Sequence, residues 1–201
     1  MHKNLPSIYY FINKFDPNHI SKLDKKIAVI YRNYNKKISF ELVSKIKTFC
    51  KLNKRIFILS NNYKLALKMD LDGVYIPSFN SDLKHLNYPK KKNFIVLGSA
   101  HNIKEIRIKE VQKVDAIFIS SLFNKKKNFL GINKFLNLIS FTKKRIIALG
   151  GINEKNLSKL RLLNINGYAG ITFFTEKKNG PAISWRAVNF FLSTTILERN
   201  R

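Results

Sequence analysis

Eight short apolar segments, each followed by a polar or amphipathic stretch, divide the 201-residue chain into similar units. The segments begin about twenty residues apart on average, which is the spacing of strand-helix units joined by tight loops. Continuous apolar runs of this length are typical of parallel strands that are buried on both faces. The expected strands are residues 7–13, 27–31, 55–59, 73–76, 93–97, 115–119, 145–149 and 168–173.

Amphipathic stretches predict helices between these strands, most clearly at 39–52, where apolar residues recur at helical spacing. Further helices are expected at 62–69, 102–111, 153–163 and 182–196, whereas 82–92 should form a weak helix or none. Three strand starts resemble one another, at Asp72, Asp115 and Gly167, which indicates repeated βαβ construction. The expected fold is therefore of the α/β class: a single (β/α)₈ TIM barrel that forms one domain over residues 1–201.

The chain is strongly basic: 38 lysines and arginines stand against 12 aspartates and glutamates, and the formal net charge is +26. Such a charge attracts the phosphates of nucleic acid. However, lysines outnumber arginines by 30 to 8, and sequence-specific readout depends mainly on arginine. Nucleic acid is therefore disfavoured as a partner. Basic residues that follow strand ends, including Arg32, suit a small phosphorylated molecule instead.

Cysteine content and hydropathy indicate the cellular compartment to expect for the chain. Cys50 is the only cysteine, so neither an intrachain disulfide nor a cysteine-based metal cluster is expected. No apolar run approaches the length of a membrane span, and the apolar segment near the start lacks a signal-peptide cleavage pattern. We therefore expect a cytoplasmic protein without a membrane partner.

A glycine pair, Gly150-Gly151, ends the seventh apolar segment, and Asn153 can cap the helix that follows. Glycine allows backbone N–H groups to come close to a ligand. In a (β/α)₈ barrel, the loops after the seventh and eighth strands often build a phosphate site that faces helix N-termini. Phe174 and Thr175 follow the expected eighth strand. The pair therefore indicates a phosphate site, and a simple tight turn is the alternative interpretation.

Four segments resemble one known family in the same order along the chain: residues 98–102 with Glu105, 115–123, 148–152 and 167–175. They are similar to thiamine phosphate synthase and its close relative thiazole tautomerase, which share a (β/α)₈ barrel. The resemblance implies a transferase of thiamine biosynthesis. In the synthase, a pyrimidine diphosphate loses diphosphate to give a carbocation, which the nitrogen of a thiazole phosphate captures. Magnesium and basic side chains hold the leaving diphosphate.

The resemblance implies roles for several residues. Gly150 and Gly151 match the phosphate-binding glycines, and Phe174-Thr175 stand where the family usually has an aliphatic residue and a phosphate-binding Ser. Ser99 matches a serine near the diphosphate. A histidine of the segment that contains His101 transfers protons in the tautomerase, work for which imidazole is suited; capping of the fifth helix is the alternative. The expected catalytic residues are Ser99, His101 and Lys126.

The diphosphate half of the site departs from the family pattern. Of a Gln-x-Arg-x-Lys motif after the second strand, only Arg32 is present. Two magnesium-binding acids are replaced by Asn61 and Asn80, and neutral amides supply no charge to hold magnesium. No metal ligand is therefore predicted at these positions, although the family uses Mg²⁺; Asp16 or Asp82 are the acids that could substitute. The diphosphate-binding residues implied here are Arg32, Lys125, Lys126 and Lys127.

The leading interpretation is a thiamine phosphate synthase-like enzyme, with full, weak or lost activity, whose partners are the two phosphorylated small molecules. A thiazole tautomerase-like isomerase and a non-catalytic barrel that binds a phosphate ester are the alternatives. A nucleic-acid-binding protein is the least favoured. The residues give no indication of the oligomeric state.

Overall fold

The computed structural model describes residues 4–35, 38–89, 91–124 and 129–175. The expected helix at 182–196 and the lysines at 125–127 lie outside these residues.

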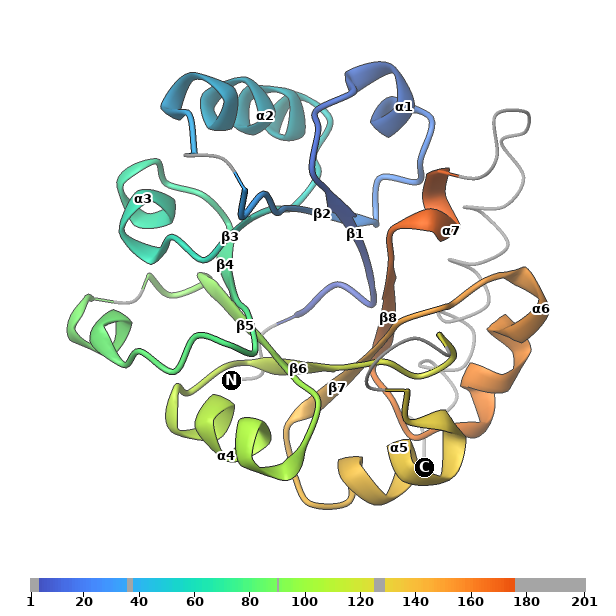
Figure 1. The fold of residues 1–201 in the computed structure, drawn as a ribbon. Coiled ribbons are helices and arrows are strands. Elements are labelled where there is room, and N and C mark those ends of the chain that lie inside the picture. Colours follow the sequence, from blue (N-terminus) through green and yellow to red (C-terminus); the bar gives the residue numbers. More distant parts are fainter. Residues whose placement is uncertain (1–3, 36–37, 90, 125–128, 176–201) are drawn as a thin grey trace.

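Eight parallel strands pair in chain order, and β8 pairs with β1, so the sheet closes into a barrel (Figure 1). The expected single (β/α)₈ barrel is confirmed. The strands are β1 (Ile8–Ile12), β2 (Ala28–Tyr31), β3 (Phe57–Ser60), β4 (Gly73–Ile76), β5 (Ile95–Ala100), β6 (Ala116–Ile119), β7 (Arg145–Leu149) and β8 (Gly167–Gly170). The surrounding helices are α1 (Pro17–Ser21), α2 (Phe40–Leu52), α3 (Tyr63–Lys68), η1 (Lys84–Asn87), α4 (Ile103–Val111), α5 (Gly131–Ile139), α6 (Glu154–Leu157), η2 (Ser158–Leu162) and α7 (Thr172–Thr175).

Two strand ends differ by three residues from the sequence predictions, and those of β1 and β3 differ by one. β5 continues to Ala100, because Ser99 and Ala100 still pair with β6. β8 ends at Gly170 instead of residue 173, and α7 begins at Thr172. Both corrections affect residues of the expected site, since they place Ser99 within a strand and move the end of β8 three residues earlier than residue 173.

Helix α5 was not predicted from the sequence. It begins after Leu130, which makes no side-chain capping hydrogen bond, and its first residue, Gly131, has a positive φ of 66°. The usual signals of a helix start are therefore missing. The weak element expected at 82–92 is confirmed as the short 3₁₀ helix η1.

The resemblance between strand starts has a physical basis at the amino-terminal end of the barrel. The side chains of Asp72, Asp115 and Asn166 each accept a hydrogen bond from a backbone amide at the start of the preceding strand, at 2.8, 2.7 and 2.9 Å. Such bonds fix the pairing of neighbouring strands. The two aspartates are therefore structural and lie at the end of the barrel opposite the mouth.

The barrel interior holds a cluster of buried apolar residues, among them four aromatic side chains, Tyr9, Phe11, Tyr75 and Phe118, which we call the aromatic floor. Their rings meet edge to face with centroids 5.0–5.8 Å apart. A second core, between the strands and the helices, buries the outer faces of the strands. The aromatic floor closes the interior beneath the carboxyl ends of the strands, where barrels of this kind place their sites.

Among the helices of the described residues, none has the length and apolar character that crossing a bilayer requires.

Candidate active site at the barrel mouth

Between the aromatic floor and the carboxyl ends of the strands, polar side chains face the interior. Alternation along a strand places Ser60 on the same side of β3 as the interior residue Ile58, and Ser99 on the same side of β5 as Leu97. Both serines are buried. The mouth therefore begins with a layer of neutral hydroxyl groups.

Arg32 follows β2 and brings a fixed positive charge to this layer. Its guanidinium carbon lies 4.8 Å from the ring centroid of Phe11 and 5.9 Å from that of Tyr34. Arginine in this position gains a cation–π interaction with the rings. The backbone amide of Arg32 also donates to Ile12 O at 2.8 Å. The guanidinium thus lies over the aromatic floor, where its remaining donors can face an anion in the mouth.

Tyrosine hydroxyls, which the sequence analysis did not select, complete this part of the site. The hydroxyl of Tyr34 lies 3.1 Å from Ser60 Oγ, and its ring packs edge to face against Phe79. The hydroxyl of Tyr75 is hydrogen-bonded to the Ser99 side chain, and burial raises the pKa of Tyr75. Burial likewise raises the pKa of Tyr34. Both hydroxyls therefore stay neutral at physiological pH and can donate hydrogen bonds. Alternation along β4 was the signal that could have selected Tyr75.

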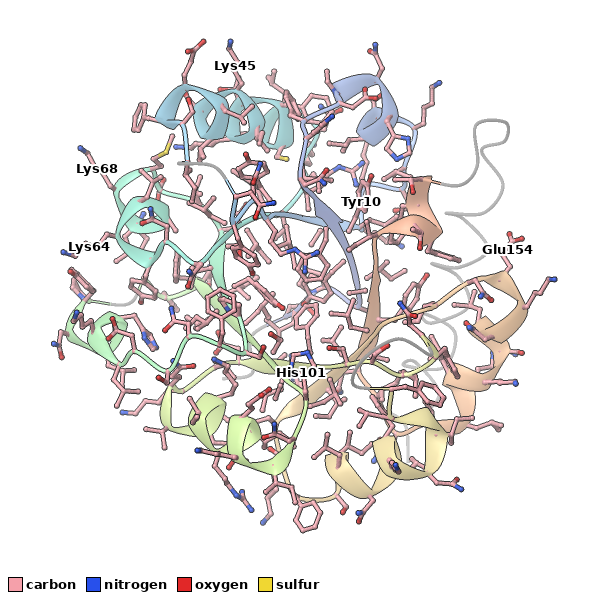
Figure 2. All side chains as sticks on the ribbon, in the orientation of Figure 1. Tyr10, Lys45, Lys64, Lys68, His101 and Glu154 are labelled. Carbon is pink, nitrogen blue, oxygen red and sulfur yellow. The ribbon has the colours of Figure 1, made fainter. Side chains whose placement is uncertain are left out.

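His101 follows β5 and is held by one carboxylate. Glu105 Oε2 accepts from the His101 backbone amide at 2.7 Å and lies 2.9 Å from His101 Nδ1. Figure 2 shows His101 at the rim of the ring of strands, beside β6. The capping role considered for His101 is wrong, because Asn102 is the N-cap residue of α4 and accepts from Glu105 N at 2.9 Å. A carboxylate on Nδ1 orients the imidazole and leaves Nε2 as the atom to act in the mouth.

The glycine pair after β7 lies against the loop after β6. Gly150 and Gly151 have positive φ values of 102° and 72°. A Cβ atom at Gly150 would lie 2.5 Å from Ser121 Oγ, and one at Gly151 would lie 2.5 Å from Asn124 N. Both the backbone conformation and the close approach therefore require glycine. Asn124, beside Gly151, is the last described residue before 125–127, the positions of the expected diphosphate lysines.

Phe174 and Thr175 lie one helical turn beyond the end of β8. The Phe174 ring is buried against Tyr10, with centroids 5.1 Å apart. Thr175 Oγ1 donates to Thr172 O at 3.2 Å. The exposed residues directly after the strand are Ile171 and Thr172. Thr172 is therefore the hydroxyl that follows the end of β8 most directly, whereas the predicted Thr175 lies one helical turn later.

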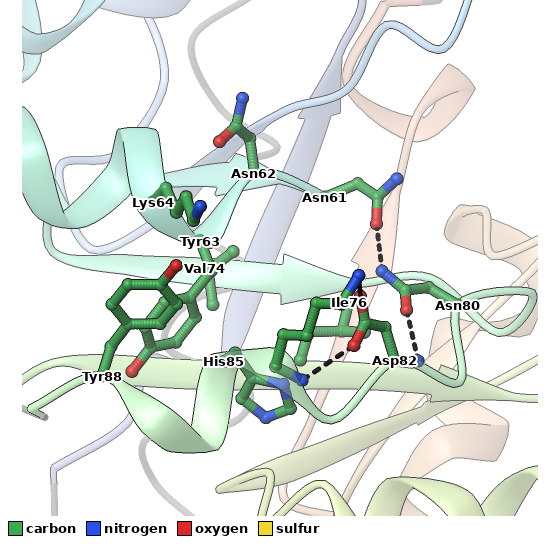
Figure 3. A pocket seen from close by; sticks show the side chains of 11 residues that line it. Asn61, Asn62, Tyr63, Lys64, Val74, Ile76, Asn80, Asp82, His85 and Tyr88 are labelled. Carbon is green, nitrogen blue, oxygen red and sulfur yellow. Dashed lines mark hydrogen bonds and ion pairs between the residues drawn. The ribbon is translucent and has the colours of Figure 1, made fainter.

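Asn61 and Asn80, the positions of the family's magnesium-binding acids, are brought together. Asn80 Nδ2 donates to Asn61 Oδ1 at 2.6 Å, and the two side chains point toward one another (Figure 3). Asn80 Oδ1 accepts from Asp82 N at 2.8 Å. The pair lines a cavity of about 200 Å³ between α3 and η1. Because one amide group satisfies the other, this pair does not fit magnesium.

The two substitute acids serve local structure. Asp16 accepts from His19 N at 3.0 Å as the N-cap of α1. Asp82 accepts from Lys84 N at 2.8 Å and lies 3.7 Å from Lys84 Nζ. Within the described ranges, no group of three or more His, Cys, Asp or Glu side chains could hold a metal ion.

The closed barrel and the polar side chains gathered over its aromatic floor define a (β/α)₈-barrel protein with a mouth of the kind that enzymes use. Comparison with known proteins makes this specific: residues 23–174 match the family model described as thiamine monophosphate synthase, and the chain belongs to this family.

Individual relatives are distant in sequence. The chain is 23% identical over 188 residues to "Putative thiamine-phosphate synthase 2" of Aquifex aeolicus, an alignment that covers 86% of this chain and 99% of the relative. It is 22% identical over 160 residues to the thiamine-phosphate synthase of Fusobacterium nucleatum, covering 77% of each chain. The fold is similar to that of thiamine phosphate pyrophosphorylase from Pyrococcus furiosus, with a TM-score of 0.79, 17% identity and coverage of 94% and 96%.

Proposed function

We propose that the chain joins a pyrimidine diphosphate to a thiazole phosphate in thiamine biosynthesis, in the cytoplasm. The carbon–oxygen bond to the diphosphate breaks, and the diphosphate leaves with the electron pair. The thiazole nitrogen then uses its lone pair to form the new carbon–nitrogen bond. The observation that carries the proposal is the family match from before β2 to within α7, which includes every loop of the mouth from β2 onward.

Arg32 is proposed to bind the diphosphate. Negative charge grows on the diphosphate as it leaves, and fixed positive groups close to that charge lower the barrier. The guanidinium is supported by Phe11 and Tyr34, and its planar donors match phosphate oxygens. Lys125, Lys126 and Lys127 are proposed to supply further charge, since they follow Asn124, which lies beside Gly151, in the chain.

The thiazole phosphate is proposed to bind at the loops after β7 and β8. Gly150 and Gly151 leave backbone groups free of side chains there, and Thr172 adds a hydroxyl at the end of β8. Phe174 supports this loop from the core, and Thr175 binds its backbone. Ser99, through its bond to Tyr75, is proposed to face the reacting groups with a neutral hydroxyl.

The rate is expected to be low. A metal ion usually contributes several kcal/mol to stabilising a leaving oxyanion, and Asn61 and Asn80 do not fit that ion. Lysine side chains, each with a single positive charge, replace a divalent ion only in part. We therefore expect weak or lost synthase activity that does not depend on Mg²⁺.

A specific contact favours a second candidate function, proton transfer on a thiazole phosphate. His101 Nδ1 lies 2.9 Å from Glu105 Oε2, and imidazole oriented by a carboxylate is a common general base. A tautomerase would use the same phosphate site but would need no diphosphate. Isomerisation of a thiazole phosphate in the absence of a pyrimidine substrate would therefore identify it.

The test is formation of thiamine phosphate from the two purified substrates, with magnesium and with chelator. We expect slow turnover that chelator does not change and that falls by at least about tenfold when Lys125, Lys126 and Lys127 are replaced by Ala. The matched control replaces Lys25, Lys26 and Lys54 by Ala, which removes the same amount of charge. These lysines precede β2 and β3 at the opposite end of the barrel. Equal losses in both variants would contradict the proposed role of residues 125–127.

A further inference from the structure

A lysine ammonium group is buried behind the loop that carries Asn80. Lys109 lies in α4 and is completely buried. Its Nζ donates to Pro77 O at 2.8 Å, to Asn80 O at 2.7 Å and to Gln112 Oε1 at 2.8 Å. All three acceptors are uncharged. Burial of an ammonium group is unfavourable unless its donors are satisfied, and here three acceptors match its three N–H groups.

Gln112 fastens the same loop to α4. Its side-chain Nε2 donates to Asn80 O at 3.0 Å and to Asp82 O at 2.9 Å, while His85 Nε2 lies 2.9 Å from Gln112 O. Gln112 is also buried. Two buried side chains of α4 and its C-cap therefore hold the backbone from Pro77 to Asp82, and the His85 side chain adds a contact to the Gln112 carbonyl.

The neighbouring strand provides the space for the lysine side chain. A Cβ atom at Gly98, in β5, would lie 2.8 Å from Lys109 Cδ. The aliphatic part of the Lys109 side chain thus packs against Gly98, and the side chain of any other residue at position 98 would collide with it. This arrangement directs Nζ toward the loop after β4 instead of toward water.

The contacts of Asn80 connect this buried group to the mouth. Lys109 and Gln112 hold the Asn80 carbonyl, and the Asn80 side chain donates to Asn61. We infer that Lys109 is a positioning residue, an internal cation that fixes the loop of residues 77–85 so that the Asn61–Asn80 pair keeps its place without a metal ion. As a role in ligand binding, this inference rests on the proposed function.

The experiment measures backbone amide exchange in the full-length chain without ligand, for wild type, Lys109→Met and Gln112→Met. Met keeps an unbranched stem and removes the donors. Lys104→Met, at an exposed position of the same helix, is the matched control. We expect exchange of residues 78–85 to become at least about tenfold faster in Lys109→Met and Gln112→Met, because the loop carbonyls lose the buried hydrogen bonds that hold the loop in place. Exchange in β5 and β6 should stay as in wild type.

A second measurement separates positioning from general stability. In Lys109→Met, affinity for inorganic diphosphate should fall about tenfold, a difference of about 1.4 kcal/mol. Affinity for inorganic phosphate, bound at the loops after β7 and β8, should stay unchanged. Unchanged exchange in the loop, or equal acceleration throughout β5 and β6, would overturn the inference. If wild type binds no diphosphate, the proposed function fails, while the exchange comparison still decides the role of Lys109. If Lys109→Met does not fold, amide exchange of residues 78–85 in Gln112→Met tests the inference, because Gln112 Oε1 is an acceptor for Lys109 Nζ.

Discussion

Asn80 Nδ2 donates a 2.6 Å hydrogen bond to Asn61 Oδ1, which joins the two loops where the family's magnesium-binding acids are expected. Asn61 has a positive φ of 58°, a conformation that Asn tolerates better than most residues. Its backbone amide donates to Tyr75 O at 2.8 Å. This hydrogen bond between two side-chain amides links the ends of β3 and β4 in place of a shared ion.

Restoring both acids should make the mouth depend on magnesium. In Asn61→Asp with Asn80→Asp, two carboxylates would face each other, and like charges at this distance repel. We expect the free energy of unfolding to fall by about 1–3 kcal/mol without metal, as the hydrogen bond is lost. Added Mg²⁺ should recover most of this loss and increase synthase turnover. Thermal unfolding with and without Mg²⁺ measures the effect on stability.

The control for this variant is Asn137→Asp with Asn164→Asp, at exposed positions outside the mouth. It adds the same charge to the chain and should show no response to Mg²⁺. If wild-type turnover is normal and vanishes with chelator, a metal site exists elsewhere in the mouth, and our interpretation of the asparagine pair is wrong.

A second prediction separates backbone strain from close approach at the glycine loop. Gly151 and Gly131 both have positive φ, 72° and 66°, but a Cβ atom would lie 2.5 Å from the nearest atom at Gly151 and 3.4 Å at Gly131. We expect Gly131→Ala to cost about 1 kcal/mol of unfolding free energy through strain. Gly151→Ala should cost more, because Asn124 must also move. Urea unfolding compares the two variants, and equal costs would contradict a required close approach.

The same loop should bind the thiazole phosphate. A ligand that binds only the native state stabilises it by about 2.7 kcal/mol at a hundredfold excess over its dissociation constant. Gly151→Asp should abolish this stabilisation, since it adds negative charge and a side chain beside the anion. An unchanged melting temperature of wild type at millimolar thiazole phosphate would show that the site lies elsewhere.

The strands were predictable because each is a short apolar run between polar segments, a pattern that depends on local sequence alone. Helix α5 was missed because Leu130 and Gly131 give no capping signal. The contacts of Lys109 with Pro77 and Asn80 join residues 32 and 29 positions apart. No local pattern marks one of 30 lysines as buried, so this part of the site required the structure.

In the candidate site, too, some residues could be predicted from the sequence and others could not. The positions of Arg32, Gly150 and Gly151 could be predicted, because each follows directly from a strand end. The hydroxyl at the end of β8 could not, since the apolar residues after Gly170 continue the strand pattern while the backbone already turns into α7. Tyr34 was missed because its contact with Ser60 joins a loop to a strand 26 positions later in the chain, and Tyr75 because alternation along β4 was not used to select it.

Two threonines of α7 test where the phosphate binds. Thr172 follows β8 almost directly, whereas Thr175 lies one turn later and its Oγ1 donates to Thr172 O. We expect Thr172→Val to weaken thiazole phosphate binding about tenfold, as loss of one hydrogen bond to a charged group costs about 1.5 kcal/mol or more. Thr175→Val, the matched change, should alter the affinity less than about twofold. Calorimetric titration measures both, and the reverse order would return the site to Thr175.

The last prediction concerns the pH dependence of stability. Burial lowers the pKa of Lys109 from its ordinary 10.5 to about 8, while the negative charge of Glu105 on the same helix opposes this shift. Below pH 8, Lys109 is protonated in both the folded and the unfolded chain. Between pH 8 and 10.5 the unfolded chain binds more protons at this position than the folded chain does. The free energy of unfolding should therefore rise with pH in this window.

The comparison with Lys109→Met isolates this effect from the other lysines, which titrate in both proteins. The difference in unfolding free energy, wild type minus Lys109→Met, should be constant between pH 6.5 and 7.5. It should then rise toward pH 9.5 with a slope of at most about 1.4 kcal/mol per pH unit. His85 and Asp82, on the loop that faces Lys109, are present in both proteins. Urea unfolding at half-unit pH steps gives the curve. A constant difference up to pH 9.5 would mean that the three oxygen acceptors fully offset the cost of burying the ammonium, and that Lys109 stays charged in the folded protein.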